Sequence, residues 1–112
     1  MGEKGSKLSP EATKVCEQVV RDLAPLGDVS QRKMFGGYGI FEGAAMFALV
    51  NSQGEVYLKA DDSNRARFED AGAERHGKMP YFLVPAEVLA NSDLLCDWAK
   101  DSIVVAHASK KK

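Results

Sequence analysis

A chain of 112 residues is of a length at which one hydrophobic core is the rule, so we predict a single domain spanning residues 1–112. It is 45% hydrophobic and 28% charged, and its formal net charge of −1 argues against nucleic-acid binding by bulk electrostatics. No apolar run reaches the length of a membrane span, and the N-terminus lacks the apolar core of a signal peptide. We therefore expect a cytoplasmic protein without membrane association, with an ordered core at about 9–108 and flexible ends at 1–8 and 109–112.

The first predicted element is a helix that begins at Ser9 and Pro10, where a hydroxyl can cap free N–H groups and proline suits the first turn. Pro25 and Gly27 end it. Its apolar residues recur at i, i+3 and i+4 spacing and form one stripe, which comprises Ala12, Val15, Cys16, Val19, Val20 and Leu23. Because Cys16 lies within this stripe, we predict a buried structural residue. With Cys96 it fits no CxxC spacing, so neither a zinc site nor a redox pair is expected.

Three strands are predicted next, at about 30–41, 44–50 and 55–60, with hairpin turns at Glu42–Gly43 and at 51–54. The first of these strands contains three glycines. Gly36 and Gly37 predict a bulge or a sharp bend, and together with Gly39 we interpret them as structural glycines where backbones bend or approach closely.

A short helix is predicted from Asp61 or Asp62 to Ala71, closed by Gly72. Its packing face is thin, with Phe68 and Ala71 as the main contributors, so we expect it to be the least stable helix.

The C-terminal third predicts a strand pair at 73–76 and 79–84 that turns near Gly77, then a short helical turn after Pro85. Asn91 or Ser92 would cap a last helix at roughly 93–107. One face of that helix collects Leu94, Leu95, Trp98, Ala99, Ser102, Val105 and Ala106, whereas Val104 points away from it. The expected fold class is α+β, in two layers, with the order helix–three strands–helix–two strands–helices and a mainly antiparallel sheet.

Two of the predicted strands, at 44–50 and 79–84, are apolar throughout rather than alternating. Such runs are typical of strands that are covered on both faces. With three helices available, one sheet face could stay open. The candidates for it are Met46, Tyr57 and Tyr81, together with Phe or Tyr side chains of the strand predicted at 30–41. A partner protein or second subunit, a small ligand, or helices wrapped around both faces could each cover that face.

Catalytic chemistry is mostly missing from the sequence. A GxGxxG pattern starting at Gly37 would need glycine where Glu42 stands, and no GK[ST] motif occurs. His76 lies in a polar turn and is interpreted as solvated, while His107 falls in the last turn of the final helix. Asp61 and Asp62 are better explained as helix caps than as metal ligands. We predict no catalytic residue, no cofactor and no metal site.

An ordered set of motifs resembles the N-terminal domain of the TfoX/Sxy competence regulators. The motifs are MFGGYGIF, MFALV, VYLKAD, a phenylalanine-containing helix that ends in glycine, MPYFLVP and LxxWA. The resemblance implies the same α+β fold and a non-enzymatic regulatory role. It also suggests a partner, because full-length regulators of that family are thought to promote transcription of DNA-uptake genes together with the cyclic-AMP receptor protein. Those regulators carry a second, C-terminal domain, so we expect a stand-alone version of the N-terminal domain here.

The expected function is a non-enzymatic regulatory domain that acts by protein–protein contact, and the resemblance implies transcriptional co-regulation as its role. Its tyrosines would supply contact area with a polar tip, and its cations would steer an acidic partner. The candidate partner-binding residues are Arg32, Lys33, Phe35, Tyr38, Tyr57 and Tyr81. The alternatives are a small-ligand binding module with an aromatic-lined sheet face, and a self-associating domain that forms a homodimer. Direct nucleic-acid binding is not expected: Arg32 and Lys33 would project to opposite faces of a strand, and the lysine tail at 110–112 is a local exception.

Overall fold

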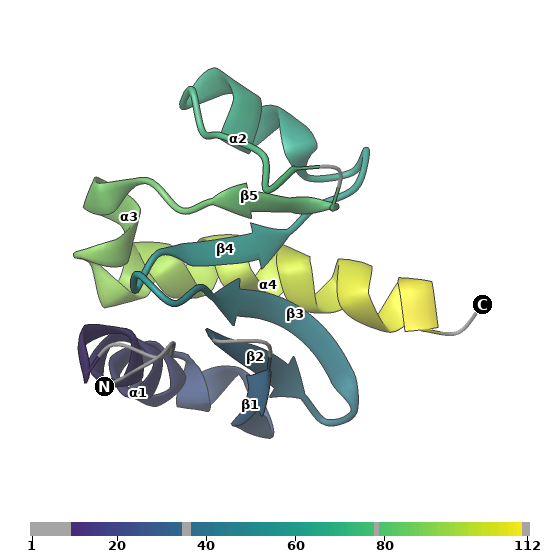
Figure 1. The fold of residues 1–112 in the computed structure, drawn as a ribbon. Helices are drawn as coiled ribbons and strands as arrows, with labels where there is room; N and C mark the ends of the chain where they lie inside the picture. The colour runs from purple at the N-terminus through teal and green to yellow at the C-terminus, as the bar shows by residue number, and fades with distance from the viewer. Residues whose placement is uncertain (1–9, 35–36, 78, 111–112) are drawn as a thin grey trace.

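The computed structural model describes residues 10–34, 37–77 and 79–110, and Figure 1 shows their arrangement. The predicted α+β class and the antiparallel sheet are confirmed. The elements in chain order are α1 (Pro10–Leu23), the 3₁₀ turn η1 (Ala24–Leu26), β1 (Val29–Met34), β2 (Gly37–Glu42), β3 (Ala45–Val50), β4 (Val56–Lys59), α2 (Arg65–Asp70), β5 (Tyr81–Leu83), α3 (Ala86–Leu89) and α4 (Ser92–Lys110). Within these residues no helix has the length and apolarity needed to cross a bilayer.

The sheet follows the order β1-β2-β3-β4-β5, and each strand pairs antiparallel with its neighbour in the chain. The predicted turns between β2 and β3 and between β3 and β4 are confirmed. Gly43 and Gly54 occupy positive φ angles of 60° and 85° in these turns, which is backbone that glycine adopts without a steric penalty.

The prediction of one bent strand at 30–41 is wrong, because this segment forms the two paired strands β1 and β2. The chain reverses between Met34 and Gly37, which stand opposite each other in the register. Phe35 and Gly36 lie outside the described residues. Because the chain reverses, β1 and β2 form backbone hydrogen bonds with each other. These bonds satisfy N–H and C=O groups that a single long strand would leave without partners. The bulge lies instead between Ile40 and Phe41, where the register against β3 shifts.

Two glycines of β2 stand where a side chain would collide with a neighbour. A Cβ atom on Gly37 would lie 2.2 Å from the backbone oxygen of Val50, and one on Gly39 would lie 2.6 Å from the sulfur of Met34. Strands β2 and β3 can therefore approach each other closely at Gly37 because glycine has no side chain there.

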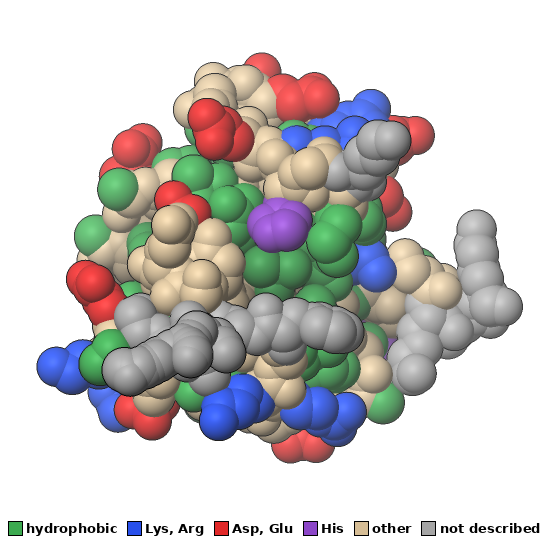
Figure 2. All heavy atoms as spheres, viewed as in Figure 1, with side chains coloured by type: hydrophobic (Ala, Val, Ile, Leu, Met, Phe, Trp, Pro, Cys, Tyr) green, Lys and Arg blue, Asp and Glu red, His purple; other side chains and the backbone are tan. Residues whose placement is uncertain are grey.

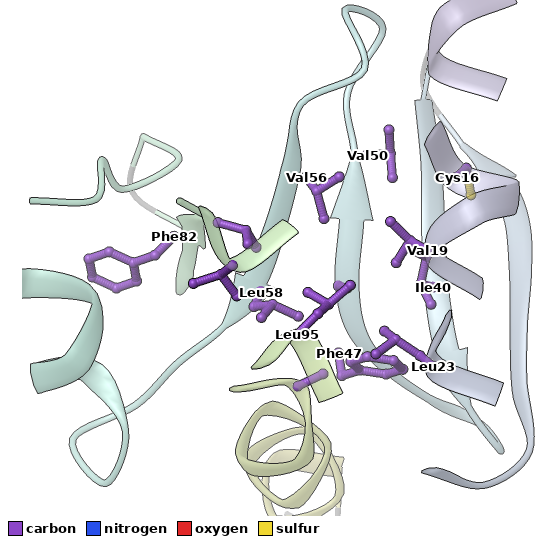
Figure 3. Packing of buried hydrophobic residues seen from close by; sticks show 14 of the residues in the cluster. Cys16, Val19, Leu23, Ile40, Phe47, Val50, Val56, Leu58, Phe82 and Leu95 are labelled. Carbon is purple, nitrogen blue, oxygen red and sulfur yellow. The ribbon is translucent and has the colours of Figure 1, made fainter. Parts of the chain in front are cut away.

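The hydrophobic core lies between the sheet and the helices α1 and α4. Figure 3 shows Val19 and Leu23 of α1 directed toward the sheet, with Leu95 of α4 beside them. The prediction that Cys16 is buried is confirmed, and this burial, followed by the charge of Glu17, raises the pKa of its thiol to about 12. A thiol with that pKa stays protonated near neutral pH and is a poor nucleophile.

Helix α2 begins at Arg65, later than predicted, and Ala71 is exposed rather than packed. The Asp61 carboxylate does not cap it. That carboxylate accepts hydrogen bonds from the backbone N–H and the hydroxyl of Ser63, at 2.8 and 2.6 Å, and so holds the preceding turn. Phe68 is the buried apolar residue of α2.

The segment 73–76 was predicted to be a strand paired with 79–84, but it forms only a single bridge, between Arg75 and Phe82. Strand β5 pairs along its length with β4. The five strands are therefore divided four and one around α2, where we expected three and two. Gly77, with a φ of 56°, turns the chain after the bridge as predicted.

Helix α4 begins after Asn91, whose side-chain oxygen accepts the N–H of Leu94 at 3.2 Å, as the capping prediction requires. Leu94 was expected on the buried face, but it is 37% exposed because it lies in the first turn, before the helix reaches the sheet. Val104 points outward as predicted and is 64% exposed.

The end of α4 is joined to the sheet by a carboxylate. His107 donates from Nε2 to Oε1 of Glu42 at 2.6 Å, and the backbone N–H of Asp28 donates to Oε2 at 3.0 Å. The Asp28 hydrogen bond first, and then the His107 hydrogen bond, lower the pKa of Glu42. Because the folded-state pKa is depressed, the resulting stability is present above the unfolded-state pKa and is lost as the pH falls through the folded-state pKa.

We therefore predict that Glu42→Gln lowers the melting temperature at neutral pH and that its difference from the wild type disappears between about pH 5 and pH 2. Thermal melts across that range measure it. Glu87→Gln, at an exposed position in α3, is the control and should show no such convergence. A difference for Glu42→Gln that is constant with pH would contradict the role of the carboxylate.

Candidate functional site on the uncovered sheet face

The pairing register divides the sheet residues into alternating rows. One row lies under the helices and is buried, and it comprises Ile40, Ala48, Leu58 and Phe82. Side chains of the adjacent positions must point to the other face, because strand residues alternate. That second row comprises Arg32, Gly39, Leu49, Tyr57 and Leu83.

We call this second side of the sheet the open face. Met34, Phe41 and Met46 also belong to it, since their side chains surround the point where a Cβ of Gly39 would lie. The apolar members are half-buried by one another. In Figure 1, α4 passes behind β3 and β4, and within the described residues no helix lies in front of them. Figure 2 shows the result from the same side, a hydrophobic surface with a histidine at its centre.

A cavity of about 330 Å³ is hollowed into the open face. Its lining includes three methionines, Met34, Met46 and Met79, together with Leu49 and His76. Met79 is 42% exposed. Methionine is unbranched and polarizable, so a surface that carries several of them can adapt its shape to an apolar partner.

His76 is not the solvated turn residue that the sequence predicted. It is half-buried, and its ring meets the Tyr57 ring edge-on, with 4.7 Å between the centroids. Burial first, and then the charges of Glu55 and Glu74, raise the pKa of Tyr57, so this phenol stays neutral. The pair gives the apolar face two groups that can form hydrogen bonds.

Basic side chains border the open face at β1 and at the end of β4. The guanidinium of Arg32 lies 4.8 Å from the centroid of the Phe41 ring, and the ammonium of Lys59 lies 6.0 Å from that of Tyr81. Tyr81 is only 5% exposed, and its hydroxyl donates to the backbone oxygen of Met46 at 3.4 Å. Burial raises the pKa of Tyr81. Tyr81 is therefore a buried member of the open face and offers a partner little accessible surface.

The six residues predicted to bind a partner do not form one surface. Arg32, Tyr57 and Tyr81 belong to the open face. Lys33 and Tyr38 stand opposite each other on the helix side, and the Tyr38 hydroxyl lies 3.1 Å from the Thr13 hydroxyl of α1. The sixth residue, Phe35, lies outside the described residues.

Sequence reasoning missed several members of the open face, namely Leu49, His76 and Met79. It included Phe41 only as one of the aromatic residues of the strand predicted at 30–41, and the alternation of β2 could have singled out Phe41 if the hairpin between β1 and β2 had been recognised. As for other chemistry, the described ranges contain no group of three or more His, Cys, Asp or Glu side chains that could hold a metal ion.

The sequence of the chain is similar to known proteins. The family model of the TfoX N-terminal domain matches residues 21–106. The DNA transformation protein TfoX1 of Aliivibrio fischeri (strain ATCC 700601 / ES114) is 41% identical over 59 residues, which are 53% of this chain and 28% of that protein. The match thus spans less than a third of the relative's length. The family model covers most of the chain, and this protein belongs to the TfoX N-terminal domain family.

Proposed function

We propose that this chain is a non-enzymatic regulatory domain that binds a partner protein on the open face. One observation carries the proposal: apolar side chains from all five strands lie on one face of the sheet, and within the described residues no helix covers that face. Contiguous exposed apolar surface on a small domain marks an interaction site more often than it marks a packing defect.

The composition of the face suits a protein partner. Its methionines supply adaptable contact area, and the Tyr57–His76 pair supplies polar groups within an apolar surround. Arg32 and Lys59 stand at the border, where cations mainly guide the approach of an acidic surface rather than add affinity.

The family suggests which process the domain serves. The matched relative is named a DNA transformation protein. The family resemblance implies the cyclic-AMP receptor protein as a partner of the full-length regulators. We propose the cyclic-AMP receptor protein as the partner and transcriptional co-regulation in the cytoplasm as the role.

The test is calorimetric titration of the domain into the cyclic-AMP receptor protein, with and without cyclic AMP and target DNA. We expect saturable binding that Leu49→Lys weakens at least tenfold, about 1.4 kcal/mol, because it puts a charge into the apolar contact. A lysine keeps an apolar stem on the sheet, so the fold should persist, and circular dichroism checks this.

The matched control is Leu94→Lys, which makes the same change at an exposed position of α4 on the other side of the sheet. It should bind as the wild type does. If both variants bind equally well, the open face is not the contact. If the wild type gives no heat at concentrations well above micromolar, the cyclic-AMP receptor protein is not the partner.

A second function is favoured by the cavity itself. A volume of about 330 Å³ that is lined mainly by apolar groups, and also by Asn51, Ser52 and His76, is of the size that holds a small apolar ligand. A small-molecule panel that raises the melting temperature of the wild type, but not of Leu49→Lys, would support this alternative.

A further inference from the structure

The two edges of the sheet differ. At the β5 edge, the N–H of His76 donates to the oxygen of Tyr81 and the N–H of Leu83 donates to the oxygen of Glu74, both at 2.8 Å. That edge is therefore partly closed by the chain. At the other edge, β1 (Val29–Met34) pairs with β2 and with no further segment in the described part of the chain. The outward N–H and C=O groups of β1 form a template for one more strand.

The side chains of this edge give the template a charge. Arg32 and Lys33 are adjacent and both exposed. The register puts them on opposite faces, since Arg32 stands opposite Gly39 of the open face and Lys33 stands opposite Tyr38 on the helix side. Two cations thus border the edge from both sides, whereas the whole chain has a formal net charge of −1.

Charged residues on an edge strand often serve only to prevent aggregation. Here they discriminate between occupants. Antiparallel pairing of β1 with a second copy of itself would gather four cations, from Arg32 and Lys33 of each copy, and like charges across neighbouring strands are destabilising. The acidic side chains of an incoming strand would instead attract Arg32 and Lys33, because opposite charges across a strand pair are stabilising.

We propose that the edge of β1 binds an extended acidic segment of a partner protein as a sixth strand of the sheet. Backbone hydrogen bonds to β1 would supply the affinity, and two adjacent acidic residues would face Arg32 and Lys33 on the two sides of the sheet. Acidic residues at adjacent positions are required because strand side chains alternate between faces. This site lies along the edge of β1 and shares Arg32 with the open face, but it does not depend on the apolar surface of that face.

The experiment uses fluorescence anisotropy with a labelled ten-residue peptide that carries two adjacent glutamates within a run of threonine and valine. We expect this peptide to bind at least tenfold more tightly than the same peptide with glutamines in their place. The double variant R32E/K33E should lose at least tenfold in affinity. Hydrogen exchange should slow at backbone amides of β1 when the peptide is bound, which charge attraction alone would not cause.

The matched control is R21E/K100E, which makes the same change in net charge at exposed positions of α1 and α4. It should bind the acidic peptide as the wild type does, and so should Leu49→Lys. If R32E/K33E and R21E/K100E lose the same affinity for the peptide, the proposal is overturned and unspecific charge attraction explains the binding. Displacement of the peptide by a single-stranded oligonucleotide would assign the cations to phosphate binding, and sedimentation as a dimer dissociated by the peptide would assign the edge to a second copy.

Discussion

Replacement of Gly37 by alanine is expected to lower the free energy of unfolding by about 3 kcal/mol, as overpacking at a site that cannot yield does. The new methyl group would lie 2.2 Å from the backbone oxygen of Val50, in the strand paired with β2. A backbone atom held in a strand ladder cannot swing aside as a flexible side chain can. Relief would require β2 and β3 to separate at this point and lose hydrogen bonds.

Urea denaturation followed by circular dichroism measures this change, with Gly43→Ala as the control. Gly43 has a φ of 60°, and a Cβ atom placed there meets nothing within 4 Å. Its replacement should therefore cost only the strain of left-handed backbone, about 1 kcal/mol. Equal losses in the two variants would show that β2 and β3 can move apart at Gly37 without penalty.

Replacement of Phe68 by alanine is expected to cost about 4 kcal/mol, the middle of the range for a buried phenylalanine. The Phe68 ring is fully buried, and it lies between Phe82 of β5 and Trp98 of α4, with centroid distances of 5.4 and 5.0 Å. It is the buried apolar residue of α2, whose other side chains are exposed or half-buried. Its loss removes the buried apolar contact of α2 together with one side of that aromatic cluster, and leaves the contacts of Arg67 with α4.

The comparison is Phe41→Ala on the open face, where the ring is half-buried and its removal leaves no enclosed cavity. That variant should lose less than half as much. Hydrogen exchange measures the effect on α2 separately: in the Phe68→Ala protein, the backbone amides of α2 should exchange far faster than those of α1 or α4. A loss for Phe68→Ala no larger than that for Phe41→Ala would mean that the aromatic cluster contributes little to stability.

Much of the fold follows from local signals. The apolar stripe of α1, the glycines of the two tight turns and the Asn91 cap each arise from interactions within a few residues, so a sequence can reveal them. The hairpin between β1 and β2 did not follow. Adjacent glycines allow both a bulge and a reversal, and only the pairing partner, which is not local information, decides between them.

The open face was harder to locate than the strands that form it. The run at 44–50 is apolar on both faces, so its sequence cannot say which face the helices cover. Tyr38 and Tyr57 look alike in sequence, yet one bonds to α1 and the other lies on the open face. His76 was misjudged because its surroundings depend on how the turn after α2 folds back onto β4.

The order of the sheet also has a consequence for how the chain acquires its structure. Strands β1 to β4 pair with sequence neighbours through short connections, so each of these pairings closes a small loop at low entropic cost. The helix that covers β3 and β4 comes from the last twenty or so residues. During synthesis, which exposes the N-terminal part first, the four-strand meander can emerge before α4 exists to cover it. Until then the nascent sheet has two apolar sides, and the chain is most in need of protection by a chaperone.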